Sequence, residues 1–215
     1  MLSTQPVCQV ICIQGLYTFG LSYLVLASFA ELWTTRYHES VGVSGLHYLA
    51  LALGYTAGTQ LSARLISKFY RYLERSRGQG QPEYRLPLFL VGSLLVPIGL
   101  LWYGWSAEAR IFWIMPDIGI AIFGFGVRLT TQCIQMYILD VYPTYIASAG
   151  AQAQLMRAIS GFTFPLFAAY LYDNLGYGYG NTVLAGTAFV IGTGTVAVLW
   201  WYGPALRRQS PYAVG

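Results

Sequence analysis

The chain has 215 residues, of which 56% are hydrophobic and only 9% are charged. An average soluble domain carries about 25% charged residues, so the composition excludes a soluble globule with a charged coat. The net charge is only +4, and the basic residues lie in short loops between apolar segments. This distribution argues against nucleic acid as a partner and favours a lipid bilayer.

Six apolar stretches follow one another along the chain. A helix needs about 20 apolar residues to cross the hydrocarbon core of a bilayer. The sequence therefore predicts an all-α membrane protein, a single transmembrane domain over residues 1–215. The first stretch has no Lys or Arg before it and is longer than a signal-peptide core, so it is expected to be a retained helix. The expected transmembrane helices lie at about 8–32, 43–65, 87–105, 112–137, 147–171 and 181–203.

Basic residues set the expected orientation. A basic loop at about 66–86 separates the second and third helices, and an even number of spans places this loop and both termini on one side. Cytoplasmic loops are enriched in Lys and Arg, so we expect a multi-pass protein of the cell membrane with both termini in the cytoplasm. The basic residues on that side are Arg64, Lys68, Arg71, Arg75, Arg77, Arg85, Arg207 and Arg208, while Arg36 and Arg110 lie in the opposite loops.

Polar side chains inside the expected helices mark the candidate functional residues. Arg128 lies near the middle of the fourth helix and Arg157 lies within the fifth. A charge at the centre of a spanning helix costs about 2.5–3.5 kcal/mol on insertion scales, so such residues usually face a cavity or a partner. The expected cavity-lining residues are Gln14, Tyr17, Arg128, Gln132, Gln135, Gln154 and Arg157. For Arg157, extension to the interface or pairing with Asp140 are the alternatives.

Asp117, Asp140 and Lys68 are the candidates for gating charges. Asp117 follows Pro116 near a helix start, where capping or an interfacial position is an equal alternative. Asp140 is expected near the cytoplasmic end of the fourth helix, where a local ion pair or cap is favoured over proton transfer. Gly54 and Gly58 form a GxxxG pair, which is expected to pack helices within the bundle.

No enzyme motif is present, because HExxH, GxSxG and Walker A patterns are all missing from the sequence. His38 and His47 lie at or near a loop, and too few polar residues converge for catalysis. We therefore predict that the protein is not an enzyme, with no catalytic residue and no cofactor. Cys8 and Cys12 have no histidine or carboxylate nearby, so packing is expected there rather than a metal site.

Several motifs, in a consistent order and spacing, resemble one family. The most specific are Pro82-Glu83-Tyr84-Arg85-Leu86-Pro87, Trp102-Tyr103-Gly104-Trp105, Phe123-Gly124-Phe125-Gly126, Tyr137-Ile138-Leu139-Asp140-Val141-Tyr142 and Gly161-Phe162-Thr163-Phe164-Pro165. Over nearly its whole length, the chain resembles the C-terminal half of fungal major facilitator superfamily (MFS) transporters. The resemblance is to the drug:proton antiporter group, which comprises multidrug, polyamine and fluconazole-resistance exporters.

The resemblance implies that the six helices match the seventh to twelfth helices of a twelve-helix exporter of small organic compounds, such as drugs or secondary metabolites. It also implies alternating access and protons as the coupling ion. Asp140 and Arg157 fall on positions that look characteristic of the family. The chain departs from the family at Ser67, where an acidic residue is usual, and at Arg128 and Asp117, where apolar residues are expected.

Two functional hypotheses remain open from the sequence. The first is an efflux transporter that needs a second six-helix half, supplied by a longer polypeptide or by a second copy in a homodimer. The alternative is a truncated, non-transporting membrane protein or an interaction subunit. A lone six-helix bundle would expose its cavity face to lipid, so an active form with a partner half is expected.

Overall fold

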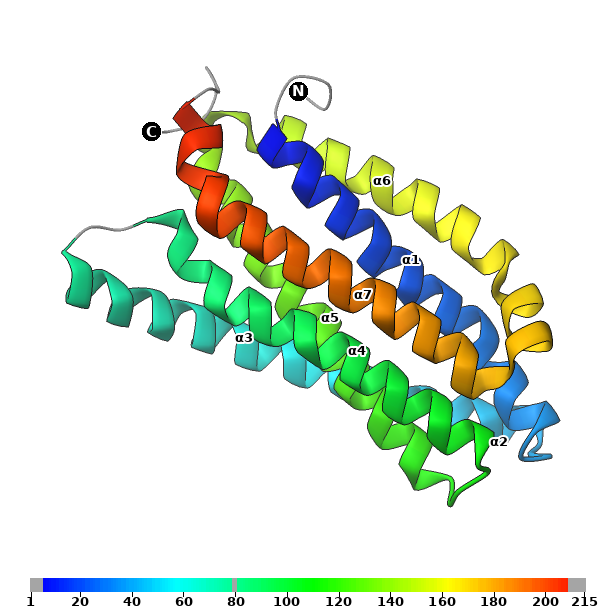
Figure 1. Ribbon diagram of the computed structural model, residues 1–215. Coiled ribbons are helices and arrows are strands. Elements are labelled where there is room, and N and C mark those ends of the chain that lie inside the picture. The colour runs from blue at the N-terminus through cyan, green and yellow to red at the C-terminus, as the bar shows by residue number, and fades with distance from the viewer. Residues whose placement is uncertain (1–5, 79–80, 209–215) are drawn as a thin grey trace.

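The computed structural model describes residues 6–78 and 81–208, which are almost entirely helical (Figure 1). The side chains of Arg77 and Arg208, two of the expected cytoplasmic basic residues, lie outside the described part. The elements are α1 (Pro6–Thr35), α2 (Val41–Leu46), α3 (Tyr48–Arg77), the 3₁₀ helix η1 (Pro82–Arg85), α4 (Leu86–Glu108), α5 (Ile114–Val141), the 3₁₀ helix η2 (Pro143–Tyr145), α6 (Ile146–Leu166) and α7 (Ala168–Arg208).

The long helices pack side by side in an order that differs from the chain order. α4 packs against both α5 and α7, α1 packs on α7, and α6 packs along α1. α3 packs along α5, so α3 and α6 lie at the two ends of this series. The first turns of α1 and α6 and the last turns of α3, α5 and α7 lie toward the same end of the molecule (Figure 1).

Buried side chains form two clusters, one toward each end of the helices. Phe29, Trp33 and Tyr103 belong to the first, and Phe89 and Tyr137 belong to the second. Lipid is as apolar as these side chains, so close packing contributes more to helix association than the hydrophobic effect. The positions of small residues, and the fit between the surfaces of neighbouring helices, therefore determine which helices pack together.

Gly54 and Gly58 allow α3 to approach α5 closely. A Cβ atom on Gly54 would lie 2.3 Å from the carbonyl oxygen of Ala121, and a Cβ on Gly58 would lie 2.8 Å from the Cβ of Arg128. No side chain fits at such distances without movement of the backbone. The GxxxG pair thus packs one helix on another within the bundle, as the sequence predicts.

α3 extends well beyond the expected second span. Residues 66–77, expected in the basic loop, continue α3 to Arg77, and only the turn from Gly78 to Gln81 and η1 connect α3 to α4. The turn residues 79–80 lie outside the described part. Arg64, Lys68, Arg71 and Arg75 are exposed on this extension. Lys and Arg are good helix formers, so the helix continues where the apolar pattern stops.

The fifth and sixth expected spans are divided differently in the structure. α6 ends at Leu166, directly after Pro165, and the chain becomes helical again from Ala168. Gly176 then breaks α7 with φ 72° and ψ 175°, a conformation that glycine adopts without strain. The Glu108 carboxylate accepts hydrogen bonds from the N–H groups of Tyr177 (2.8 Å) and Gly178 (3.2 Å). Glu108 of α4 therefore caps the long second part of α7.

Four segments of the described chain are long and apolar enough to cross a membrane: Pro6–Thr35, Pro82–Glu108, Ile114–Val141 and Ala168–Arg207. α3 and α6 are long but more polar. α3 carries basic residues along its second half, and α6 carries Gln152, Gln154 and Arg157. The structure thus establishes an all-helical protein with four apolar candidate spans.

Candidate functional site

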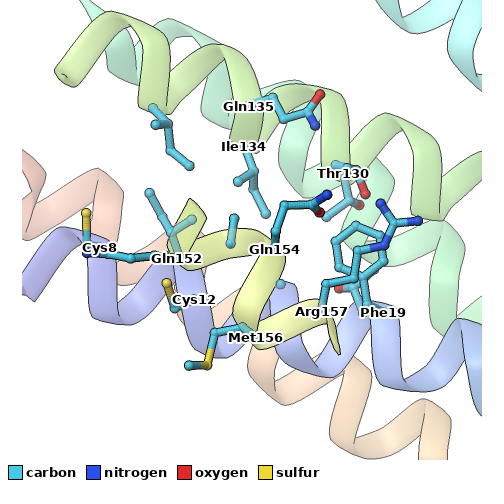
Figure 2. A pocket seen from close by; sticks show the side chains of 16 residues that line it. Cys8, Cys12, Phe19, Thr130, Ile134, Gln135, Gln152, Gln154, Met156 and Arg157 are labelled. Atoms are coloured by element: carbon cyan, nitrogen blue, oxygen red, sulfur yellow. The ribbon is translucent and has the colours of Figure 1, made fainter. Parts of the chain in front are cut away.

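A cavity lies between α1, α5 and α6 (Figure 2). Its volume is about 80 Å³, and it is partly open to the surroundings. Its wall is mostly apolar with a few polar groups, as in sites for small organic molecules. The lining residues are Cys8, Ile11, Cys12, Gly15, Thr18, Phe19, Thr130, Thr131, Ile134, Gln135, Ile138, Gln152, Ala153, Gln154, Met156 and Arg157. We call this space the α1/α5/α6 cavity.

Arg157 lies at one end of this cavity, beside Phe19 of α1 (Figure 2). Its guanidinium carbon is 4.4 Å from the centroid of the Phe19 ring. A cation over an aromatic face gains about 0.5–2 kcal/mol, more when both groups are desolvated. The alternative that Arg157 binds Asp140 is wrong, because Asp140 is held by another arginine.

Arg128, near the midpoint of α5, lies over the ring of Tyr55 from α3, with its guanidinium carbon 4.5 Å from the ring centroid. Its side chain is half-buried, and its Nε is buried without a hydrogen-bond acceptor among the described residues. Arg128 was expected to line a cavity, but it is not among the residues that line the α1/α5/α6 cavity.

The expected glutamines divide between the cavity and its surroundings. Gln135 of α5 and Gln154 of α6 line the α1/α5/α6 cavity, together with Gln152 of α6. The Oε1 atom of Gln152 is buried without a hydrogen-bond partner. Gln132 is half-buried on α5 and lies outside the lining of this cavity.

Gln14 and Tyr17 instead connect α1 to α7. Gln14 is buried, its side chain donates to Thr18 (3.1 Å), and its Oε1 accepts a long hydrogen bond from Thr195 (3.5 Å). The Tyr17 hydroxyl donates to the carbonyl oxygen of Leu184 (3.0 Å) and contacts the hydroxyl of Thr187. Both side chains therefore hold two helices together, on a different side of α1 from Phe19 and Arg157.

The candidate gating residue Asp140 forms a two-pronged ion pair with Arg85, which comes from η1. Arg85 Nε lies 2.6 Å from Oδ2 and Nη2 lies 3.1 Å from Oδ1. The Arg85 guanidinium also lies 4.7 Å from the centroid of the Tyr70 ring on α3. Nearby, Arg207 at the end of α7 pairs with the buried Glu83 at 2.7 Å. Lys68 is exposed, and no ion pair of the described residues includes it.

Asp117 belongs to a second charged cluster at the opposite end of the helices. His47 bonds to Asp117 Oδ2 through Nδ1 (2.8 Å) and to Glu39 Oε2 through Nε2 (2.9 Å). The imidazole is 7% exposed and stacks on Trp33 with the ring centroids 3.5 Å apart. Both hydrogen bonds form together when imidazole carries a proton on each nitrogen. The cluster therefore ties α5 and the start of α3 to the loop after α1.

Tyr37 strengthens the same end of the molecule. Its hydroxyl donates to the carbonyl oxygen of Ile111 in the loop between α4 and α5 (2.8 Å). Burial raises the pKa of this hydroxyl, and the nearby carboxylates of Asp117 and Glu39 raise it further. Tyr37 thus stays a neutral donor and adds a second link between these loops.

Sequence reasoning missed several partners of the charged residues. The sequence places His47 only at or near a loop, and it gives no signal that Tyr55 or Phe19 contacts a charged residue. Each lies on another helix than the charge that it contacts, so helical spacing gives no signal for the pairing. Arg85 was counted among the basic residues, and its position three residues after Pro82 gave no indication of Asp140.

The chain is similar along its whole length to named fungal transporters. It is 47% identical to "Efflux pump vrtL" of Penicillium aethiopicum, over 100% of this chain and 43% of that protein. It is 41% identical to "MFS-type transporter oryF" of Aspergillus oryzae, over 97% of this chain and 44% of that protein. It is 39% identical to "Probable efflux pump mfs2" of Aspergillus flavus, over 99% of this chain and 51% of that protein.

No protein-family model matches the chain, and no solved structure matches it. The chain spans about half the length of the curated relatives that it matches. The matched region covers 97–100% of the chain, so it includes the helices that line the cavity. This chain is therefore related, from end to end, to about half of a fungal efflux pump or transporter of the MFS type.

Proposed function

We propose that this chain is the C-terminal half of an MFS-type transporter that exports small organic compounds, such as drugs or secondary metabolites, across the cell membrane. The observation that carries the proposal is the match of the whole chain to about half of proteins named as efflux pumps. The α1/α5/α6 cavity supports it, because a mostly apolar space with a few polar groups suits such compounds.

The proposal includes six transmembrane helices, with α3 and α6 added to the four apolar spans. α3 has 30 residues and α6 has 21, so each is long enough to cross the hydrocarbon core. Their polarity fits this arrangement, because Tyr55 of α3 contacts Arg128 and Arg157 of α6 lines the α1/α5/α6 cavity. The basic end of α3 then lies in the cytoplasm with both chain termini.

A second six-helix half completes the proposed transporter, in the same polypeptide or in another chain. α3 and α6 lie at the ends of the helix series, and large apolar residues such as Leu155, Ile159 and Phe162 are exposed on α6. Two halves that rock about a central site give alternating access. Proton coupling is part of the proposal by resemblance to the antiporter group.

Export is tested in a yeast strain that lacks its own broad-specificity exporters. Cells that express the protein are expected to retain less of the neutral dye Nile red than cells with an empty vector, and a protonophore is expected to abolish the difference. Arg64→Gln, a change at an exposed position of α3, serves as the matched variant that keeps export. Equal retention with and without the protein would overturn the proposed export function.

The second half is tested by crosslinking in membranes before extraction. The chain is expected to join another six-helix unit, or to run as part of a longer polypeptide with six further spans. An isolated single bundle of six helices that still exports Nile red would contradict this part of the proposal.

A further inference from the structure

The charges of this chain are segregated by depth. All eight acidic residues lie at or near helix ends. Glu31, Glu39, Glu108, Asp117 and Asp173 are at the end that carries His47, and Glu74, Glu83 and Asp140 are at the other end. Arg128 and Arg157 lie near the midpoints of α5 and α6. The middle of the described bundle thus carries two positive charges and no carboxylate.

The acids nearest to the bundle interior already have partners. Asp117 binds His47, Asp140 binds Arg85 and Glu83 binds Arg207. Glu108 pairs with Arg36 at 3.7 Å and caps α7. None of the described ion pairs includes Arg128 or Arg157. A charge at this depth is costly unless it meets an opposite charge or a water-filled cavity, so these two arginines are available to a negative group from outside this chain.

The surroundings of the two guanidinium groups are aromatic. Arg128 lies over Tyr55 and Arg157 lies over Phe19, at 4.5 and 4.4 Å from the ring centroids. In general, a ring stacked on the face of a guanidinium group does not use its N–H groups, which can donate to the two oxygens of a carboxylate. Beyond Arg157, Ile11, Ile134 and Ile138 form an apolar part of the cavity wall.

We propose that this transporter selects anionic aromatic compounds, with a carboxylate or phenolate held by Arg157 and the ring system in the α1/α5/α6 cavity. Arg128 lies outside the cavity lining and adds a second positive charge to the middle of the bundle. The inference rests on the proposed export function and assigns its substrate class. A carboxylate contributed by the other half of the transporter is the competing partner for the arginines. The two possible partners predict different binding. Only a substrate anion makes the affinity of the protein for a compound depend on the charge of that compound.

Three probes with one ring system separate charge from size: naphthalene-2-carboxylate, naphthalene-2-methanol and 2-naphthylmethylammonium. Binding to the purified protein in nanodiscs is measured by competition with the radiolabelled carboxylate. Export of each probe is measured in the yeast strain described above. The protein is expected to bind the carboxylate about tenfold or more tightly than the alcohol, a factor that corresponds to about 1.4 kcal/mol, and the ammonium most weakly.

Arg157→Gln is expected to lower carboxylate affinity about tenfold, as for loss of one charge-assisted hydrogen bond, while alcohol affinity changes less than twofold. Arg128→Gln, which removes a charge outside the cavity lining, is expected to lower carboxylate affinity by a smaller factor. Arg157→Lys keeps the charge and is expected to retain most of the preference for the carboxylate. Arg64→Gln removes one positive charge from an exposed position of α3 and is expected to leave all three affinities unchanged. The Lys variant and this control separate loss of charge from loss of folding.

The outcomes distinguish the inference from the function on which it rests. Export of the probes without preference for the carboxylate would overturn the anionic substrate class and leave the export function standing. Carboxylate binding that depends on the two arginines, without export of any probe, would support the site and overturn the export function. Equal weakening of all three probes by the Gln variants, with Arg157→Lys no better, would assign the arginines to a carboxylate of the other half and overturn the inference.

Discussion

Single residues matter most in this protein where charges are buried, and His47 is the clearest case. His47→Ala leaves the Asp117 carboxylate, which is only 13% exposed, without its hydrogen-bond partner and removes the stacking on Trp33. Breaking a buried pair costs about 3–5 kcal/mol. Because Glu39, the other partner of His47, is partly exposed, we expect the free energy of unfolding to fall by about 3 kcal/mol, the lower end of this range. Thermal unfolding in detergent, followed by tryptophan fluorescence, measures it. His38→Asn, at an exposed position with φ 57°, is the matched control, and equal unfolding temperatures for the two variants would contradict the role of His47.

At the site, the sequence identifies the charged residues but not the residues that they contact. Arg128, Arg157, Asp117 and Asp140 stand out because charges are rare in apolar helices. Their partners cannot be found in the same way, since Tyr55, Phe19, His47 and Arg85 come from other elements. Spacing along one helix predicts which side chains share a face. It carries no information on which face of a neighbouring helix lies opposite.

At the scale of elements, the contact of α3 with α5 depends on glycine. Gly54→Ala places a Cβ atom 2.3 Å from the carbonyl oxygen of Ala121, so the helices must separate. Overpacking of this kind costs about 1–3 kcal/mol. Gly186→Ala in α7 is the matched control, because its Cβ meets nothing within 4 Å and alanine favours a helix. The fraction of folded protein in increasing sodium dodecyl sulfate is expected to fall for the first variant only. A lower stability of Gly186→Ala than of Gly54→Ala would refute the packing argument.

Element boundaries follow from the sequence only where apolar runs and helices coincide. The expected spans 87–105 and 112–137 overlap α4 and α5 because these helices are apolar over most of their length. α3 continues to Arg77 as a charged helix. A search for apolar stretches does not detect a helix of this kind. The breaks at Phe167 and Gly176 depend on local backbone geometry, and on Glu108 of a distant helix. Those contacts appear only once the helices are assembled.

At the scale of the whole molecule, the distribution of charge between the two ends of the helices predicts the topology. We expect Arg75 in the cytoplasm and Arg110 outside, because basic residues gather at the end of α3 and at the C-terminal end of the chain. Arg75→Cys and Arg110→Cys are matched changes at exposed positions, made after replacement of the buried Cys8, Cys12 and Cys133 by alanine. A membrane-impermeant maleimide is expected to label the Arg110→Cys variant in intact cells and the Arg75→Cys variant only after permeabilisation. The reverse pattern would invert the topology, and labelling of both in intact cells would mean that α4 does not span the membrane.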